Sequence, residues 1–290
     1  MDVASVCVVG SVNLDQSFTV GALPHPGETV LASSLTSAPG GKGGNQAVAA
    51  ARAGAAVQLV AALGDDAAAA DLRAHLSGND VGLDGTVTVP GPSGAAAIVV
   101  DAGAENVIVV APGANAHLSM ASARARQAVA AAEVVLMQLE IPVDVALAAA
   151  RVARERGAVV MVNASPSGAD PAALAALADV VDVVVVNEVE AGEWHWPVDH
   201  LVITRGAAGV RYRSGDTDLD LPAPSVEPVD TTGAGDVFSG VLAAEWLSGT
   251  QRALRRACAA GALATLTAGA GDCAPTAEAI DDVVQDEEKA

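Results

Sequence analysis

The stretch VVLMQLE, residues 134–140, changes from apolar to charged within a few positions. It begins with four apolar residues, whereas Gln138 is polar and Glu140 is charged. A short apolar run of this kind is typical of a strand that is buried on both faces of a parallel sheet. The stretch therefore predicts a central strand that ends beside a carboxylate.

Further apolar runs follow the same pattern and are separated by alanine-rich stretches of helical composition. Strands that alternate with helices predict a parallel sheet covered by helices. We therefore expect a fold of the α/β class, a three-layer α/β/α sandwich with a mostly parallel central sheet, in one domain over residues 1–290. The other runs are VCVVG (6–10), VQLVAALG (57–64), VVMVNAS (159–165), VVDVVVVN (180–187) and HLVITRG (200–206).

The stretches between these runs carry helix end signals. Asp66 is available as an N-cap of one helix, and Gly78 can end the same helix. The predicted helices span residues 43–53, 66–78, 118–131, 143–156, 234–247 and 251–267.

Two segments, residues 12–36 and 94–111, mix polar and apolar positions and contain turn signals such as PHPGE and DAGAEN. This pattern predicts antiparallel strands with one face in water. A small sheet of this kind, appended to the main domain, could serve as a lid over a site. A second alternating pair, GVRYRS and DLDLP within residues 209–222, predicts a hairpin at the edge of the main sheet.

The charge and cysteine content exclude several classes of protein. Lysine and arginine number 15 against 35 aspartates and glutamates, and the formal net charge of −20 disfavours nucleic acid or a membrane as a partner. Cys7, Cys258 and Cys273 are widely scattered and indicate neither a disulfide framework nor a zinc site. Residues 1–10 lack the features of a secretory signal, so we expect a cytoplasmic protein.

The stretch VDTTGAGDVFSG, residues 229–240, places glycines and a carboxylate at the start of an apolar helical run. Gly233 and Gly235 allow the backbone to approach a ligand, and the helix directs its N–H groups and positive dipole end at an anion. Asp236 would repel a phosphate there unless it has another task, such as accepting a proton from a hydroxyl. A glycine-rich turn capped by Asp236 is the alternative interpretation of this motif alone.

A second glycine-rich stretch, APGGKGGNQAVAAARAG at residues 38–54, surrounds Lys42 with glycines and opens a helix at Asn45. It is not a Walker A loop, because no serine or threonine follows the lysine. The first predicted strand is followed by GSVNLD and not by a G-x-G-x-x-G fingerprint, which argues against a nicotinamide-binding dehydrogenase.

With these two stretches, motifs along almost the whole chain resemble those of the ribokinase-like (PfkB) carbohydrate kinases in order and approximate spacing. The resemblance implies a mostly parallel sheet between helices, with a small β-sheet lid that also forms a homodimer contact. The motifs are GSVNLD (10–15), LPHPGET (23–29), GGKGGNQAVAAARAGA (40–55), LGDD (63–66), NVIVVAPGAN (106–115), LMQLEIP (136–142), NEVEA (187–191), ITRGAAG (203–209) and VDTTGAGDVFSG (229–240).

The resemblance also implies the residues of the site. Amides and carboxylates suit a polyol, because each can donate to or accept from hydroxyls. The residues implied to hold the sugar are Asn13, Asp15, Gly41, Lys42, Asn45, Glu140 and Asp236. Those implied to border ATP are Asn187, Thr204, Gly206, Gly235 and Cys258.

Two cations complete the implied set. Glu190 would organise Mg²⁺ through water, which that ion prefers to retain. An activating K⁺ would be held mostly by backbone carbonyls of Asp230, Thr232, Ala264, Thr267, Gly269 and Cys273. A serine is usual in the family where Cys273 stands, and a thiol is a poor ligand for hard potassium.

The resemblance thus implies an ATP-dependent sugar kinase that makes D-ribose 5-phosphate from D-ribose. Asp236 would act as general base, and the amides of Gly233, Ala234, Gly235 and Asp236 would form the anion hole. The alternatives are a kinase of the same family that acts on deoxyribose, fructose or adenosine, and a sugar-binding sensor without catalysis. Only GEWHWPVD separates NEVEA from HLVITRG, so a helix of the family is expected to be missing there, with Trp194 and Trp196 packing over the gap.

Overall fold

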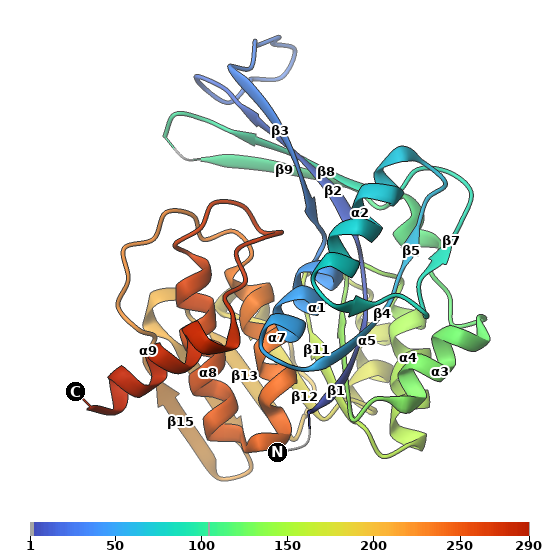
Figure 1. Cartoon of the computed structure of the whole chain (residues 1–290), viewed down its shortest axis with the longest axis vertical. Coiled ribbons are helices and arrows are strands. Elements are labelled where there is room, and N and C mark those ends of the chain that lie inside the picture. The colour runs from blue at the N-terminus through green and yellow to red at the C-terminus, as the bar shows by residue number, and fades with distance from the viewer. Residues whose placement is uncertain (1–2, 104, 290) are drawn as a thin grey trace.

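A nine-stranded sheet forms the centre of the computed structural model, which describes residues 3–103 and 105–289 (Figure 1). Residues 1, 2, 104 and 290 lie outside the described part, and with them the ends of the predicted domain 1–290 and one position of the predicted segment 94–111. In spatial order the strands are β15 (Thr217–Leu221), β14 (Val210–Ser214), β13 (His200–Thr204), β12 (Val183–Asn187), β11 (Val159–Asn163), β10 (Val134–Gln138), β1 (Ser5–Val9), β4 (Ala56–Val60) and β6 (Val81–Gly82).

The strands from β13 to β6 pair in parallel, whereas β14 and β15 form an antiparallel hairpin at the edge. Every apolar run of the sequence analysis overlaps one of these parallel strands, and the predicted edge hairpin is also confirmed. Two further short strands, β5 (Ala62–Leu63) and β7 (Val87–Thr88), pair beside the main sheet.

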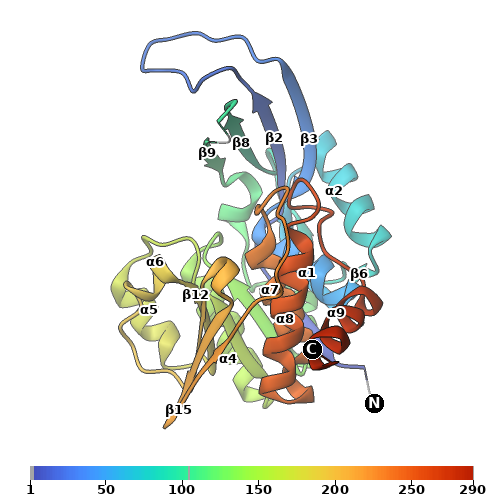
Figure 2. The same cartoon turned by 90° about the vertical axis from the view of Figure 1, so that its left-hand side faces the viewer.

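Helices cover both faces of the main sheet, as Figure 2 shows from the side. Successive side chains of a strand point to opposite faces. Val6 and Val8 of β1 therefore pack with one set of helices, and Cys7 and Val9 pack with the other. The first set is α1 (Lys42–Arg52), α2 (Ala67–Gly78), α7 (Ala234–Glu245), α8 (Thr250–Ala264) and α9 (Ala277–Lys289), and the second is α3 (Ala123–Ala131), α4 (Val143–Glu155) and α5 (Pro171–Ala178). The predicted three-layer sandwich is confirmed.

Most predicted helices end close to their expected limits, and the Asp66 side chain accepts the N–H of Ala69 as the predicted N-cap of α2. The helix predicted over residues 118–131 is wrong at its start. It begins at Ala123, because Ser122 caps it and a 3₁₀ turn occupies Gly113–His117. The predictions omitted α5 and the short α6 (Glu188–Ala191).

The lid is a separate four-stranded sheet in the order β3 (Ser34–Gly40), β2 (Asn13–Thr19), β8 (Gly94–Val100) and β9 (Asn106–Ala111). It projects from the main body at the top of Figure 1. Two corrections apply to the predicted segments. β3 continues to Gly40, beyond residue 36, and β2 pairs with β8 in parallel, not antiparallel. Each segment forms its own antiparallel hairpin, and the two hairpins join through strands that leave the main body in the same direction.

The main sheet places several polar residues at one edge. β10, β11, β12 and β13 end at Gln138, Asn163, Asn187 and Thr204. The carboxyl ends of neighbouring parallel strands lie together, and ligands of open α/β sheets bind outside that edge. None of the described helices is both long and apolar enough to cross a bilayer.

Candidate active site

The start of α7 forms a turn that only glycine adopts without strain. Gly233 has a φ of 81°, and a Cβ at this position would lie 2.8 Å from the Cα of Ala270. The helix begins with Ala234, whose N–H donates to the Thr231 carbonyl at 3.3 Å. Within the described residues, the N–H groups of Gly235 and Asp236 have no backbone acceptor. These two amides are the free donors of a helix N-terminus, where an anion binds favourably.

Asp236 is held by two amide side chains of α1. Asn45 Nδ2 donates to Asp236 Oδ2 at 3.0 Å, and Gln46 Nε2 donates to Asp236 Oδ1 at 3.0 Å. The Asp236 residue is only 7% exposed. Its carboxylate therefore has one hydrogen-bond donor on each oxygen, which fixes its orientation.

The residues expected around the sugar lie together beside this carboxylate. Asn13 and Asp15 belong to β2, which pairs with the end of β3 at Gly40. Gly41, with a φ of 86°, turns the chain from β3 into α1, so that Lys42 N–H donates to Glu140 Oε2 at 3.2 Å. A Cβ on Gly41 would lie 2.7 Å from the Asn13 backbone nitrogen, so the turn requires glycine.

Charges in this cluster shift two pKa values. Burial, and after it the neighbouring Glu140 and Asp236, raise the pKa of Asp15 to about 7. Burial alone would lower the pKa of Lys42, but attraction to Asp236, Glu140 and Glu190 raises it above its usual value. Asp15 Oδ1 is a buried oxygen without a hydrogen-bond partner in the described structure. An acceptor left unpaired in this way suits a hydroxyl-bearing ligand.

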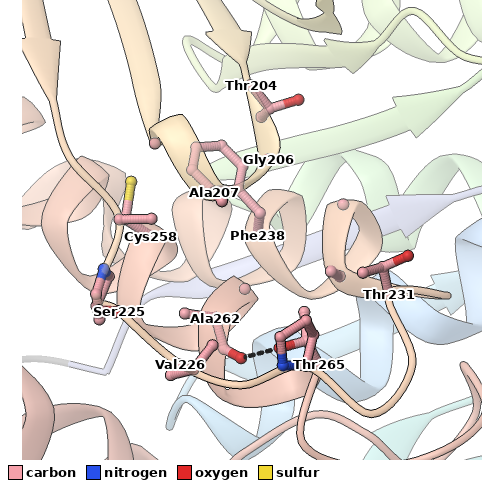
Figure 3. A pocket seen from close by; sticks show the side chains of 17 residues that line it. Thr204, Gly206, Ala207, Ser225, Val226, Thr231, Phe238, Cys258, Ala262 and Thr265 are labelled. Atoms are coloured by element: carbon pink, nitrogen blue, oxygen red, sulfur yellow. Dashed lines mark hydrogen bonds between the residues drawn. The ribbon is translucent and has the colours of Figure 1, made fainter.

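Two cavities meet at the N-terminus of α7. The larger has a volume of about 430 Å³ and is lined by Thr204, Gly206, Gly235 and Cys258, among other residues (Figure 3). The smaller has a volume of about 140 Å³, and Lys42, Asn187, Glu190 and Asp236 belong to its lining. Thr204 and Gly235 line both cavities, so the two are adjacent. The structure thus places every residue expected to border ATP at one of these two adjacent cavities.

The large cavity is mostly apolar. Figure 3 shows the Phe238 ring of α7 and the Cys258 side chain of α8 at its wall. No charged side chain belongs to its lining among the described residues. The small cavity, by contrast, contains one ammonium and two carboxylates. A large apolar space that is adjacent to a small charged one suits a ligand with an apolar end and an anionic end.

Asn187 and Glu190 form a capping box at the start of α6. Asn187 Oδ1 accepts the Glu190 N–H at 2.8 Å, and Glu190 Oε2 accepts the Asn187 N–H at 2.9 Å. The motif therefore has a structural role of its own. No group of three or more histidine, cysteine or acidic side chains could hold a metal among the described residues. A site with so few carboxylates suits Mg²⁺ bound mainly through water and phosphate oxygens, with Glu190 as one of the two carboxylates in the small cavity.

The two loops expected to hold K⁺ lie against each other. Asp230 Oδ1 accepts the Thr232 N–H at 2.9 Å, and Asp230 Oδ2 accepts the Gly269 N–H at 2.8 Å. Burial alone would raise the pKa of Asp230, but these hydrogen bonds lower it. The Cys273 thiol donates to the Ala270 carbonyl at 3.3 Å. Ala264 and Thr267 lie at the end of α8, where Thr267 N–H donates to the Ala264 carbonyl. The Asp230 side chain thus joins the two loops.

The segment after α6 is short, and the structure describes no helix between residues 192 and 199. Trp194 is 8% exposed and packs edge-to-face on Trp196, with ring centroids 5.4 Å apart. Trp194 Nε1 donates to the Trp196 carbonyl at 3.0 Å. Both rings pack against the sheet face that carries α4 and α5, as expected, and neither lines the two cavities.

Sequence reasoning missed several buried polar residues that support the site. Ser11 Oγ donates to Glu140 Oε2, and Asn115 Nδ2 donates to Asn13 Oδ1 at 2.8 Å. Gln46 and Asn163 are hydrogen-bonded at 3.2 Å below Asp236. Two of them had a visible signal, because Gln46 is a polar residue in an alanine-rich helix and Asn163 ends an apolar run.

Comparison with known proteins identifies relatives along the whole chain. A family profile described as pfkB family carbohydrate kinase matches residues 3–277. The ribokinase of Bacillus subtilis (strain 168) is 34% identical over 294 residues, which cover 97% of this chain and 99% of that protein.

Solved structures agree with the sequence comparison. Arabidopsis thaliana ribokinase complexed with ribose and ATP is 27% identical, has a TM-score of 0.88 and aligns over 98% of this chain and 99% of its own. Ribokinase from Cryptococcus neoformans var. grubii serotype A in complex with ADP is 30% identical, has a TM-score of 0.85 and aligns over 96% and 99% of the two chains.

Proposed function

The chain belongs to the pfkB family of carbohydrate kinases, and on that premise we propose that it phosphorylates the 5-hydroxyl of D-ribose with ATP. Relatives named ribokinase, and ribokinase structures that hold ribose and ATP or ADP, support this pair of substrates. The observation that carries the proposal is the position of Asp236. It lies at a helix N-terminus and lines a small charged cavity that is adjacent to a large apolar one.

The chemistry follows from this position. The base and ribose of ATP occupy the large cavity, and the phosphates extend over the start of α7. Asp236 takes the proton of the sugar hydroxyl, whose oxygen attacks the γ-phosphorus in line. The bond from the γ-phosphorus to the bridging oxygen breaks, and ADP leaves. The N–H groups of Gly235 and Asp236 and the Lys42 ammonium offset the charge on the transferring group.

The surroundings of Asp236 hold the sugar. Asn13, Asp15, Asn45 and Glu140 supply acceptors and donors for its hydroxyls, and Asp15 Oδ1 is available because it has no partner among the described residues. When bound near Glu190, Mg²⁺ would supply electrostatic stabilisation of the phosphate oxygens. A buried site built to pair with hydroxyls rejects analogues that lack them.

The assignment has a direct test in the Asp236→Asn variant. We expect kcat to fall on the order of 10²- to 10⁴-fold, because the amide cannot accept the proton, while ATP binding stays nearly unchanged. Asp216→Asn, at an exposed aspartate in the β14–β15 turn, is the matched control and should retain wild-type turnover. Normal turnover of Asp236→Asn would remove Asp236 from the mechanism.

A panel of substrates tests which sugar the enzyme phosphorylates. D-ribose, 2-deoxyribose, fructose and adenosine are compared in one coupled ATP assay, run once in potassium and once in sodium buffer. We expect the highest kcat/KM for ribose. A preference for another of these substrates would assign the chain to that activity within the same family, and binding without turnover of any would favour a sensor.

Three further features belong to the proposal. The facing loops around Asp230 and Gly269 support activation by K⁺. The exposed apolar strand β9, with Val109 64% exposed, supports a homodimer through the lid. Three buried cysteines, none of them in a disulfide within the described residues, are compatible with action in the reducing cytoplasm.

A further inference from the structure

Gln46 lies directly beneath Asp236 and is fully buried, with 0% of its surface exposed. It belongs to α1, and Asp236 lies 190 positions later in α7. Asn45 also reaches Asp236, but the proposed function gives Asn45 a contact with the sugar. Gln46 is enclosed, lines neither cavity and has no access to a ligand.

The hydrogen bonds of Gln46 fix the orientation of its amide. Its Oε1 accepts Gln138 Nε2 at 2.6 Å, so the amide nitrogen points the other way. That nitrogen has two hydrogens and two acceptors, Asp236 Oδ1 at 3.0 Å and Asn163 Oδ1 at 3.2 Å. Both donors are therefore used, and a rotated amide would place its oxygen against two other oxygens.

The partners of Gln46 are themselves anchored to the main sheet. Gln138 ends β10, and Asn163 ends β11. Asn163 Nδ2 donates to the Val185 carbonyl of β12 at 3.2 Å. A continuous chain of amides thus connects the carboxylate on α7 to three neighbouring strands. Gln138 Oε1 is the one atom of these amides that is buried without a partner in the described structure, whereas all the amide hydrogens and the oxygen of Gln46 are paired. The paired amide of Gln46 is therefore held in one arrangement.

We propose that Gln46 is a positioning residue, which holds the Asp236 carboxylate in the orientation and the ionised state that proton transfer requires. This inference rests on the proposed role of Asp236. Donation from Gln46 reaches Oδ1, while Asn45 donates to Oδ2. Hydrogen bonds to a carboxylate favour its charged form, so loss of the Gln46 donor should move the acid limb of the pH–rate profile to higher pH.

Other charged groups also face Asp236. Lys42 on α1 attracts its negative charge, whereas Asp15 on β2, Glu190 on α6 and Glu140 after β10 add negative charge to the same site. The Cys273 thiol, whose pKa burial raises to about 11, also lies within the influence of Asp236. None of these groups changes when Gln46 alone is replaced, so a shift in the pH profile reports on the Gln46 contact.

The test is Gln46→Met, which keeps a similar volume and removes both donors and the acceptor. We expect kcat to fall about 10- to 100-fold, the effect of a misplaced catalytic group, while the KM for ribose changes less than about 3-fold. The acid limb of the kcat/KM profile moves to higher pH. Gln46→Glu, of unchanged size, places a carboxylate against Asp236 and moves the limb in the same direction.

Gln58→Met is the control for loss of a glutamine side chain away from the site. Gln58 lies on β4, and its Oε1 is buried without a partner in the described structure. This variant should leave kcat and the pH profile unchanged. If circular dichroism shows that both Gln46 variants are folded, and both keep the wild-type kcat and the wild-type acid limb of the kcat/KM profile, Gln46 has no positioning role. Should Gln46→Met fail to fold, Gln46→Glu decides alone.

Asp236→Asn, measured in parallel, separates the two proposals. Loss of turnover in Asp236→Asn together with wild-type kinetics in the Gln46 variants would overturn only the positioning role. Normal turnover in Asp236→Asn would instead remove the general base on which both proposals depend.

Discussion

Asp15 shows how a single residue couples the site to stability. Its carboxylate is partly buried near Glu140 and Asp236, and burial and these charges raise its pKa from 3.8 to about 7. Between these two values the folded protein keeps a proton that the unfolded chain has lost. The free energy of unfolding therefore falls as the pH rises through this interval. A residue that suits a sugar hydroxyl thus destabilises the protein when no sugar is bound.

Asp15→Asn should remove this contribution, because the amide does not ionise. We expect the stability difference between variant and wild type to increase from about pH 4 to about pH 7 in favour of the variant, and then to level off. Urea unfolding at several pH values, without sugar, measures the free energy of unfolding of both proteins. Asp216→Asn is the control at an exposed aspartate. Parallel stability profiles of Asp15→Asn and wild type would contradict a raised pKa. The same variant should bind ribose more weakly.

At the scale of elements, α1 and α7 together build the site. α1 carries Asn45 and Gln46, and α7 carries Asp236, so the packing of these two helices sets the distance between donors and carboxylate. Gly240 of α7 permits the close approach, since a Cβ there would lie 2.4 Å from the Gln46 carbonyl oxygen. The two helices therefore pack as one unit on one face of the sheet, and this packing positions the Asp236 carboxylate.

One glycine of α1 has no such constraint. A Cβ on Gly44 would find its nearest atoms at 3.8 Å, in Leu76 and Val12, which is ordinary contact. Gly44→Ala should stabilise the protein by up to about 0.5–1 kcal/mol, which is the cost of glycine relative to alanine in a helix interior and an upper bound for the first turn of α1. Thermal or urea unfolding measures this change, and kcat should stay at the wild-type value.

The neighbouring glycine supplies the control for that prediction. A Cβ on Gly43 would lie 2.6 Å from the carbonyl carbon of Gly10, which is backbone and cannot move aside. Gly43→Ala should therefore destabilise the same helix. Equal effects of the two substitutions would show that steric contact at the start of α1 does not govern its stability.

At the scale of the whole molecule, the four-stranded sheet expected to form the lid leaves one apolar edge strand exposed. Its edge strand β9 exposes apolar side chains along its length, with Val107 50%, Ile108 49%, Val109 64% and Val110 45% exposed. An exposed apolar edge strand is a template for pairing with another chain. The proposed homodimer would cover this exposed apolar strand.

Val109→Asp should weaken this dimer, because it places a charge in the apolar contact. Light scattering at several protein concentrations should give the mass of a dimer for the wild type and that of a monomer for the variant. Val3→Asp, at an apolar residue 63% exposed away from the lid, is the control and should stay dimeric. A wild type that is monomeric at all concentrations would contradict dimerisation through β9.

Much of the fold was predictable because its signals are local. Each buried parallel strand is an apolar run, and the glycine at 233 before Asp236 marks the start of α7. The parallel pairing of β2 with β8 was not predictable, because no turn connects these strands directly. The start of α3 was misplaced because alanine-rich composition does not distinguish a 3₁₀ turn from an α-helix. The resemblance to a family, in turn, predicted which polar residues lie at the site.

The sequence by itself determined which segments are strands and helices, and that a carboxylate follows a glycine turn at a helix start. Only the tertiary structure decided that Gln46, from a helix 190 positions earlier, donates to that carboxylate. It also decided that Asp15 lies near Glu140 and Asp236, and that Thr204 and Gly235 line two adjacent cavities. The physical reason is that strand order and helix packing bring distant residues into contact, and these long-range arrangements leave no periodic signal in the chain.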